Sequence, residues 1–249
     1  MNIYVCVKQV PDTEARVQVG GDGKSIDSAD INTILNPFDE FAVEQALLTK
    51  EKNGGEVTAV SLGDSGAAAA IRTAMAMGVD KGIHLKTGQS ADEPLQVGKT
   101  LAREIGGSGV DVVFFGRQAV GNEHGQVGLI VAELLAIPAI SEVSSLEVGS
   151  DSASGKREVE GGSESFTTSL PAVFTAQKGL NEPRYPSLKG RMAAKKKPIE
   201  EREVTLDEPK LTVEKIGYPP ERSRGMIVGE GAAAIPELVR LLKEEAKVL

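Results

Sequence analysis

The stretch VDVVFFGRQAVGNEHGQVG, residues 110–128, decides how the sequence is interpreted. It begins with the most apolar strand candidate of the chain, Val110–Phe115, and Gly116 ends that strand. A polar, glycine-rich loop then leads into a helix expected over 127–136. The amide groups near Gln126 to Gly128 point out of the N-terminus of that helix, where free N–H groups attract phosphate. The stretch predicts a strand–loop–helix unit with a candidate cradle for a nucleotide phosphate.

This cradle differs from the common phosphate motifs. The loop lacks the Gly-Lys-Ser/Thr spacing of a P-loop. The first strand is followed by Val10-Pro11-Asp12-Thr13, where a dinucleotide fingerprint would have Gly-x-Gly-x-x-Gly. A second candidate loop, Gly63-Asp64-Ser65-Gly66, fits an ordinary turn whose side chains cap the next helix. From its residues alone, a glycine-rich loop after a strand is therefore a weak signal of nucleotide binding.

Strand and helix signals alternate on the N-terminal side of this stretch. Strands are expected over 3–7, 57–62 and 82–85, and helices begin at Asn36-Pro37, at Ala67 and at Pro94. Asn36 suits the cap position, and Pro37 suits the first helical position. Such alternation favours a mostly parallel sheet with helices on both faces. Ligands of such folds bind beyond the carboxyl ends of the strands, where this loop lies.

The pattern changes after Pro138. Antiparallel strands are expected over 140–148, 157–160 and 165–170, with a connection at 150–155, and a further strand over 171–176. A long polar stretch, 181–198, follows and contains Lys195-Lys196-Lys197. A tail from residue 201 is expected to end in a helix over 236–248. The predicted fold is therefore a Rossmann-like α/β domain with an added antiparallel hairpin and a C-terminal arm.

Composition excludes several classes of protein. The 249 residues are 40% hydrophobic and carry a formal net charge of −8, which argues against nonspecific binding of nucleic acid or anionic membranes. No apolar run approaches the ~20 residues of a membrane span, and the N-terminus has no signal-like region, so a cytoplasmic protein is expected. Cys6 and the two histidines, His84 and His124, show no spacing typical of a metal or nucleophilic site.

Seven short segments stand out beside the nucleotide loop. They are Val5–Asp12, Asn36–Glu40, Arg72–Asp80, Gly116–Ala119, Lys156–Gly162, Leu170–Val173 and Leu180–Tyr185, the last running on to Met192–Lys197. Each segment is unspecific by itself. Together and in this order, over roughly residues 1 to 200, they closely resemble the electron transfer flavoprotein beta subunits.

The resemblance implies a cofactor arrangement. In this family a larger alpha subunit holds most of the FAD, and the beta subunit has a fold of the adenine nucleotide alpha hydrolase type that binds AMP structurally. By position, this pocket would be lined by Cys6, Asn36, Pro37, Phe38, Asp39, Leu62, Gly116, Gln118, Asn122, Glu123, Gly125, Gln126 and Val127. Pro11 and Thr13 would approach the flavin.

The resemblance also implies two partners. The segment 184–197 would be a recognition loop for an acyl-CoA or similar dehydrogenase, with Leu188 as its apolar anchor. Tyr185, Met192, Lys195 and Lys196 would complete this docking surface. Residues 1–200 would form the nucleotide-binding domain, and residues 201–249 an arm that packs on the alpha subunit.

The nucleotide loop leaves two branches of the family open. AMP-binding relatives often have acids at the positions of Gly121 and Asn122, and Asn and Thr at those of Gly125 and Val127. The electron-bifurcating branch, which binds a second FAD and NADH in beta, often reads Asp-Gly-Asp-Thr and then Gln-Val-Gly-Pro. Gln-Val-Gly at 126–128 favours that branch, whereas the missing acids and proline do not.

The expected function is electron transfer without a catalytic residue in this chain. A dehydrogenase would reduce the FAD, and the heterodimer would pass the electrons to another redox partner. Two alternatives stay open at this point: a bifurcating subunit that oxidises NADH, and a non-redox adenine-nucleotide module.

Overall fold

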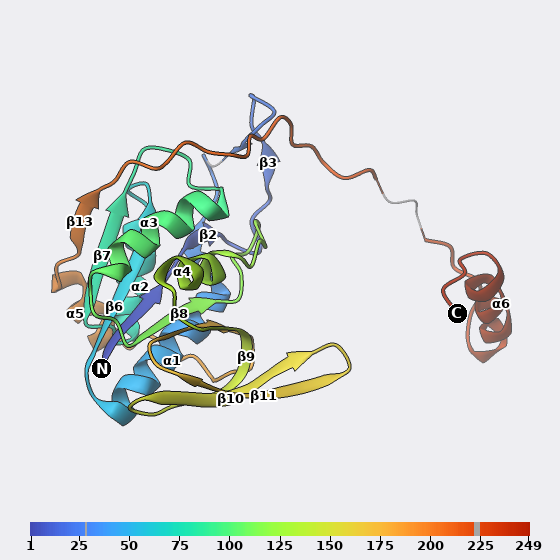
Figure 1. Cartoon of the computed structure of the whole chain (residues 1–249). Helices are drawn as coiled ribbons and strands as arrows, with labels where there is room; N and C mark the ends of the chain where they lie inside the picture. Colours follow the sequence, from blue (N-terminus) through green and yellow to red (C-terminus); the bar gives the residue numbers. More distant parts are fainter. Residues whose placement is uncertain (28, 222–224) are drawn as a thin grey trace.

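The computed structural model describes residues 1–27, 29–221 and 225–249. A nine-stranded sheet forms its centre, in the order β11-β10-β9-β12-β8-β1-β6-β7-β13 (Figure 1). Its strands are β1 (Asn2–Cys6), β6 (Glu56–Gly63), β7 (Lys81–Lys86), β8 (Val112–Gly116), β9 (Ala139–Val148), β10 (Ser152–Val159), β11 (Gly162–Ser169), β12 (Ala172–Ala176) and β13 (Glu200–Glu203). The pairs from β9 to β13 are parallel, and β10 and β11 add the antiparallel hairpin. The predicted fold class is confirmed.

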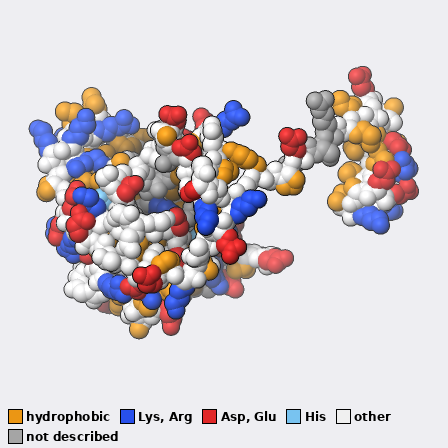
Figure 2. Space-filling model, turned by 90° about the horizontal axis from the view of Figure 1, so that it is seen from above, with side chains coloured by type: hydrophobic (Ala, Val, Ile, Leu, Met, Phe, Trp, Pro, Cys, Tyr) orange, Lys and Arg blue, Asp and Glu red, His pale blue; other side chains and the backbone are white. Residues whose placement is uncertain are grey.

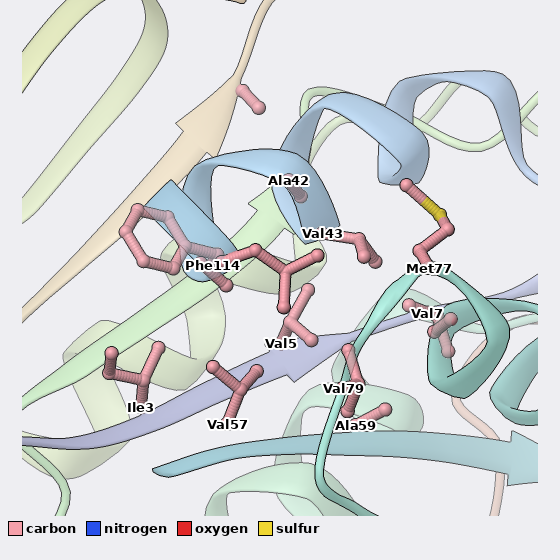
Figure 3. Close-up of a cluster of buried hydrophobic side chains, with 14 of the residues drawn as sticks. Ile3, Val5, Val7, Ala42, Val43, Val57, Ala59, Met77, Val79 and Phe114 are labelled. Carbon is pink, nitrogen blue, oxygen red and sulfur yellow. The ribbon is translucent and has the colours of Figure 1, made fainter. Parts of the chain in front are cut away.

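Four helices cover the two faces of the sheet. They are α1 (Pro37–Asn53) and α2 (Ala67–Met77) on one face, and α3 (Pro94–Gly106) and α4 (Val127–Leu135) on the other. Alternation along β1 builds both layers of the core, because successive side chains of a strand point to opposite faces. Ile3 and Val5 pack with Val43 of α1 (Figure 3), whereas Tyr4 and Cys6 belong to the layer under α3 and α4.

The antiparallel region differs from the prediction in where it turns. The connection expected at 150–155 is largely part of β10, which begins at Ser152, and the β10–β11 turn lies at Glu160–Gly161. Gly155 explains the difference, since it is a strand residue and not a turn residue. A Cβ there would lie 2.0 Å from the Ser145 carbonyl oxygen, so glycine permits close pairing with β9.

Two small sheets follow β1 along the chain. Strands β2 (Gln9–Pro11) and β5 (Thr33–Leu35) pair beside the carboxyl end of β1. Between them, β3 (Gln18–Val19) and β4 (Ile26–Asp27) form a short hairpin around the turn expected at 20–23.

The polar stretch 181–198 contains a helix that the sequence did not predict. Helix α5 (Leu188–Lys196) packs on α2, where a Cβ at Gly190 would lie 2.5 Å from the Ala76 carbonyl oxygen. The Arg72 guanidinium of α2 donates to the carbonyls of Ala194 and Lys197 at the C-terminal end of α5. The sequence of α5 has no clear apolar stripe, so these contacts with α2, and not a pattern in its own sequence, stabilise the helix.

The C-terminal arm leaves the sheet after the edge strand β13 and ends in helix α6 (Ile235–Glu244), preceded by a 3-10 turn (Ala232–Ala234). Helix α6 lies far from the sheet (Figure 1), and Figure 2 shows hydrophobic side chains on its surface. Residues 222–224 of the predicted arm lie outside the described residues. The division at residue 200 stays a prediction, and β13 spans that position.

Candidate functional site

A cleft opens at the carboxyl ends of β1, β6 and β8, where the fold class predicts a ligand. Ten of the predicted pocket residues line it: Cys6, Asn36, Asp39, Leu62, Gly116, Gln118, Asn122, Gly125, Gln126 and Val127. The other three predicted pocket residues do not line it: Pro37 and Phe38 lie in the first turn of α1, and Glu123 lies in the loop with a left-handed backbone. Pro11 and Thr13, which the resemblance places near the flavin, lie in β2 and in the turn that follows.

Asn36 holds the glycine-rich loop in place. Its side-chain amide nitrogen donates to Asp39 Oδ1 at 2.8 Å and to the Gln118 carbonyl at 2.9 Å. Its side-chain oxygen accepts from the Val120 amide at 3.1 Å. Asn36 occupies the cap position of α1 as predicted, but its side chain makes no capping hydrogen bond to the helix. It connects the start of α1 to the loop after β8 instead.

Asp39 joins three segments at the cleft. Its carboxylate accepts from the Lys8 amide at 2.7 Å, from Asn36, and from the Gly116 amide at 3.2 Å. Burial raises the pKa of the Asp39 carboxyl to about 7, although these three hydrogen bonds favour the charged form. The carboxyl thus ties the ends of β1 and β8 to α1, and it titrates near neutral pH.

Gly116 is required for this close approach. A Cβ on Gly116 would lie 2.3 Å from Asp39 Oδ1 and 2.7 Å from the carbonyl carbon of Phe38. Any side chain there would push α1 away from the end of β8. The strand-ending glycine expected from the sequence therefore has a packing role as well.

The N-terminus of α4 forms the cradle of the cleft. Helix α4 begins at Val127, and no side chain caps it, so its first amide groups have no side-chain partner where residues 125–128 line the cleft. Gly128 lets the helix approach the sheet, since a Cβ there would lie 3.0 Å from Thr175 and 3.2 Å from Phe115. Free N–H groups at the positive end of a helix fit a phosphate group.

The opposite wall of the cleft was not predicted. It consists of Ala91, Asp92, Pro94, Val97 and Leu101, from the end of β7 to the middle of α3. These residues follow a parallel strand, so the rule that ligands bind at carboxyl strand ends could have drawn attention to the segment. Nothing local in the sequence distinguishes it from an ordinary loop.

Lys8, Arg117 and His124 supply the basic side chains along the cleft. Burial lowers the pKa of the Lys8 ammonium, and the carboxylates of Asp92 and Asp39 oppose this effect. Lys8 belongs to the segment Val5–Asp12, which resembles the family, but it was not predicted as a pocket residue. Its place two residues after Cys6, the last residue of β1, is the signal that could have marked it.

Cys6 and His84 are both buried. Burial raises the pKa of the Cys6 thiol well above its usual value, so the thiol stays protonated and forms part of the apolar floor. His84 is fully buried, and its Nε2 lies 3.3 Å from the Gly63 carbonyl oxygen. Among the described residues, no group of three or more side chains could hold a metal ion. In the same part of the chain, no helix is long and apolar enough to cross a membrane.

The predicted docking residues lie together on and before α5. Tyr185 is 95% exposed and Leu188 is 79% exposed, and Met192 lies one turn after Leu188 on the same face. Lys195 and Lys196 are exposed in the last turn. The segment is a helix and not the loop that was expected, because α2 holds it.

Arg184 fixes the segment that leads into this surface. Its guanidinium bonds the buried Glu44 carboxylate at 2.8 Å and the Glu51 carboxylate at 2.6 Å, both on α1. Asn181 donates to the Phe41 carbonyl of the same helix at 3.0 Å. The segment that carries the exposed Tyr185 and Leu188 is therefore fixed to α1.

Fold and site together define a doubly wound α/β protein whose cleft combines an apolar floor with an uncapped helix N-terminus. The family model of the electron transfer flavoprotein domain matches residues 24–207. The chain is 42% identical to the electron transfer flavoprotein subunit beta of Bacillus subtilis (strain 168), over 100% of both chains. It is 37% identical to subunit beta of Homo sapiens, over 100% of this chain and 99% of the relative. The chain therefore belongs to the electron transfer flavoprotein family, among its beta subunits.

Proposed function

We propose that this beta subunit binds AMP in the cleft and, with an alpha subunit that holds most of the FAD, carries electrons from an acyl-CoA or similar dehydrogenase to a second redox partner. The observation that carries the AMP proposal is the loop 116–126, held by Asn36 and Asp39 against the uncapped N-terminus of α4. An electron carrier subunit of this kind needs no catalytic side chain.

Three parts of the cleft suit the parts of AMP. The amide groups at 125–128 would take the phosphate. The floor of Cys6, Leu62 and Phe115, together with Val97 of the wall, would take the adenine ring, whose flat faces are apolar. Asp92 offers a carboxylate of the kind that hydrogen-bonds ribose hydroxyls.

The chain's own residues bind and orient in this proposal. FAD supplies the electron-transfer chemistry when it is bound, and this chain contributes a wall near Pro11 and Thr13. The exposed apolar face of α5, with the lysines behind it, is the proposed dehydrogenase docking surface. Basic groups beside an apolar anchor suit a partner with acidic residues around a groove. The cytoplasmic location expected from the sequence stays a prediction.

The alpha subunit is the proposed partner of the C-terminal arm. Helix α6 exposes Ile235, Leu238 and Val239, and Leu211 and Val213 are exposed near the start of the arm. An apolar stripe of this extent is typical of a surface that another chain covers. The beta-subunit family is consistent with such a partner.

Nucleotide analysis tests the proposal directly. The chain is co-expressed with its alpha subunit, the purified complex is denatured, and FAD and AMP are quantified by chromatography. One FAD and one AMP per heterodimer would support the proposed carrier. Two FAD without AMP would replace it by the bifurcating alternative, and NADH oxidation would then be measured. A complex without any flavin would contradict the redox function.

A further inference from the structure

The unpredicted wall of the cleft is attached to the beginning of the C-terminal arm. The wall runs from the end of β7 through Asp92 into the first turns of α3. Residues 87–93 belong to no helix or strand, so individual contacts and not a regular ladder set their conformation. The Thr87 amide donates to the Gly63 carbonyl at 3.0 Å, and within the segment Ser90 donates to the Asp92 carboxylate. Further contacts come from residues 204–210, which we name the arm root.

Hydrogen bonds join the arm root to the wall along its length. The amides of Val204, Leu206 and Lys210 donate to the Lys86 carbonyl at 2.9 Å, to Gln89 Oε1 at 2.7 Å and to Glu93 Oε2 at 2.6 Å. In the opposite direction, the Gln96 side chain donates to the Asp207 carbonyl. The side chains of Gln89 and Glu93, on either side of Asp92 in the chain, therefore accept hydrogen bonds from backbone amides of the arm root.

Asp207 adds a charged attachment to α3. Its carboxylate oxygens lie 2.8 and 3.0 Å from Arg103 Nη2, and Lys99 Nζ lies 3.4 Å away. The hydrogen bond from Arg103, followed by that from Lys99, lowers the pKa of the Asp207 carboxyl. Next to it, Leu206 is only 5% exposed. The arm root is thus fixed by one buried apolar side chain and one shared carboxylate.

We propose that the arm root is a positioning element of the nucleotide cleft: Leu206 and Asp207 hold the wall that carries Asp92, and nucleotide affinity depends on them. This inference rests on the proposed binding of AMP in the cleft. A wall without these attachments samples more conformations when it is empty. Ordering it on binding then costs conformational entropy, which weakens the complex.

The test uses the full-length chain, freed of nucleotide, and titration calorimetry with AMP. Asp207→Ala is expected to weaken AMP binding about fivefold and to speed amide hydrogen exchange at residues 87–93. Gln89→Ala, which removes the acceptor for the Leu206 amide, is expected to act in the same direction. Asp207→Glu, which keeps a carboxylate for Arg103, should restore most of the affinity. None of these residues lines the cleft.

Glu237→Ala is the matched control, because it removes an arginine ion pair, with Arg240 at 2.7 Å, in the same arm but far from the cleft. It should leave AMP affinity and exchange at 87–93 unchanged. If the wild-type chain binds AMP and both Asp207→Ala and Gln89→Ala bind it equally well, the inference is wrong while the proposed function stands. If the wild-type chain does not bind AMP, the proposed function and this inference are both overturned.

Discussion

The Asp39→Asn variant should be less stable than the wild-type chain at acid pH and more stable than it at alkaline pH. Asp39 is buried, and three donors point at its carboxylate, from Lys8, Asn36 and Gly116. An Asn side chain has one acceptor oxygen and must turn its amide group toward at least one of these donors. At pH 4, where the carboxyl is neutral, the variant should be less stable by about 1 kcal/mol, the contribution of one hydrogen bond.

The sign of the pH effect follows from proton binding. Below about pH 4 the Asp39 carboxyl is protonated in the folded and the unfolded chain. Between pH 4 and 7 the unfolded chain releases this proton while the folded chain keeps it, so the free energy of unfolding falls as pH rises. A rise of the pKa from 3.8 to about 7 corresponds to about 4 kcal/mol at 1.36 kcal/mol per pKa unit. The Asn variant lacks this loss and should be the more stable protein at pH 8.

Urea denaturation followed by circular dichroism measures the free energy of unfolding of the wild-type chain and of the Asp39→Asn variant, both free of nucleotide. The difference between wild type and variant, taken at each pH from 4 to 8, removes the contribution of every other titrating group. We expect this difference to change sign near pH 5. A difference that stays constant over this range would refute the reasoning, because the three donors would then hold the carboxylate charged at its ordinary pKa.

Three further predictions concern packing, anchoring and docking. Gly116→Ala should lower the free energy of unfolding by about 1–3 kcal/mol and weaken AMP binding by calorimetry, whereas Gly21→Ala, with nothing within 4 Å of its Cβ, should change neither. Arg184→Ala should lower the free energy of unfolding by about 2–3 kcal/mol in urea denaturation, because it removes the arginine partner of the buried Glu44 carboxylate. Arg240→Ala, which removes only exposed ion pairs, should leave it nearly unchanged. In the heterodimer, Leu188→Ala should slow the reduction of the bound FAD by an acyl-CoA dehydrogenase, measured by stopped flow, while FAD content stays the same. Unchanged reduction kinetics would rule out a docking role for Leu188.

Local sequence signals were enough for the elements of the core. The helix predicted to begin at Ala67 is the observed α2, and the apolar runs of β1, β6, β7 and β8 were placed to within about two residues. The signals for these elements are local: apolar runs mark the buried strands, and glycine or proline marks the helix ends. The loop after β8 was found from local signals too, because an apolar strand and a glycine precede it.

The elements that the sequence did not indicate depend on distant partners. Strand β13 is four charged residues, Glu200–Glu203, and pairs with β7 at the sheet edge, where Lys86 lies 3.6 Å from Glu201 and 3.4 Å from Glu203. Helix α5 depends on α2 in the same way. The wall with Asp92 is part of the cleft only because parallel strands bring their carboxyl ends together. Non-local contacts of this kind leave no periodic pattern in the chain.

The loop after β8 is supported through backbone groups, not through its own side chains. Its position is set from outside, by Asn36 and Asp39 of the α1 start, through bonds to the backbone of Gln118, Val120 and Gly116. The proposed phosphate-binding groups are also backbone amides, at the start of α4. Substitutions at 122 and 127 therefore change side-chain contacts to a ligand but not these backbone groups, whereas Gly121 and Gly125 have left-handed backbones, with φ of 93° and 62°, that favour glycine. A site fixed through backbone groups keeps its shape while side chains such as those of Asn122 and Val127 vary, so the proposed AMP cradle depends on backbone amides and on the bonds from Asn36 and Asp39.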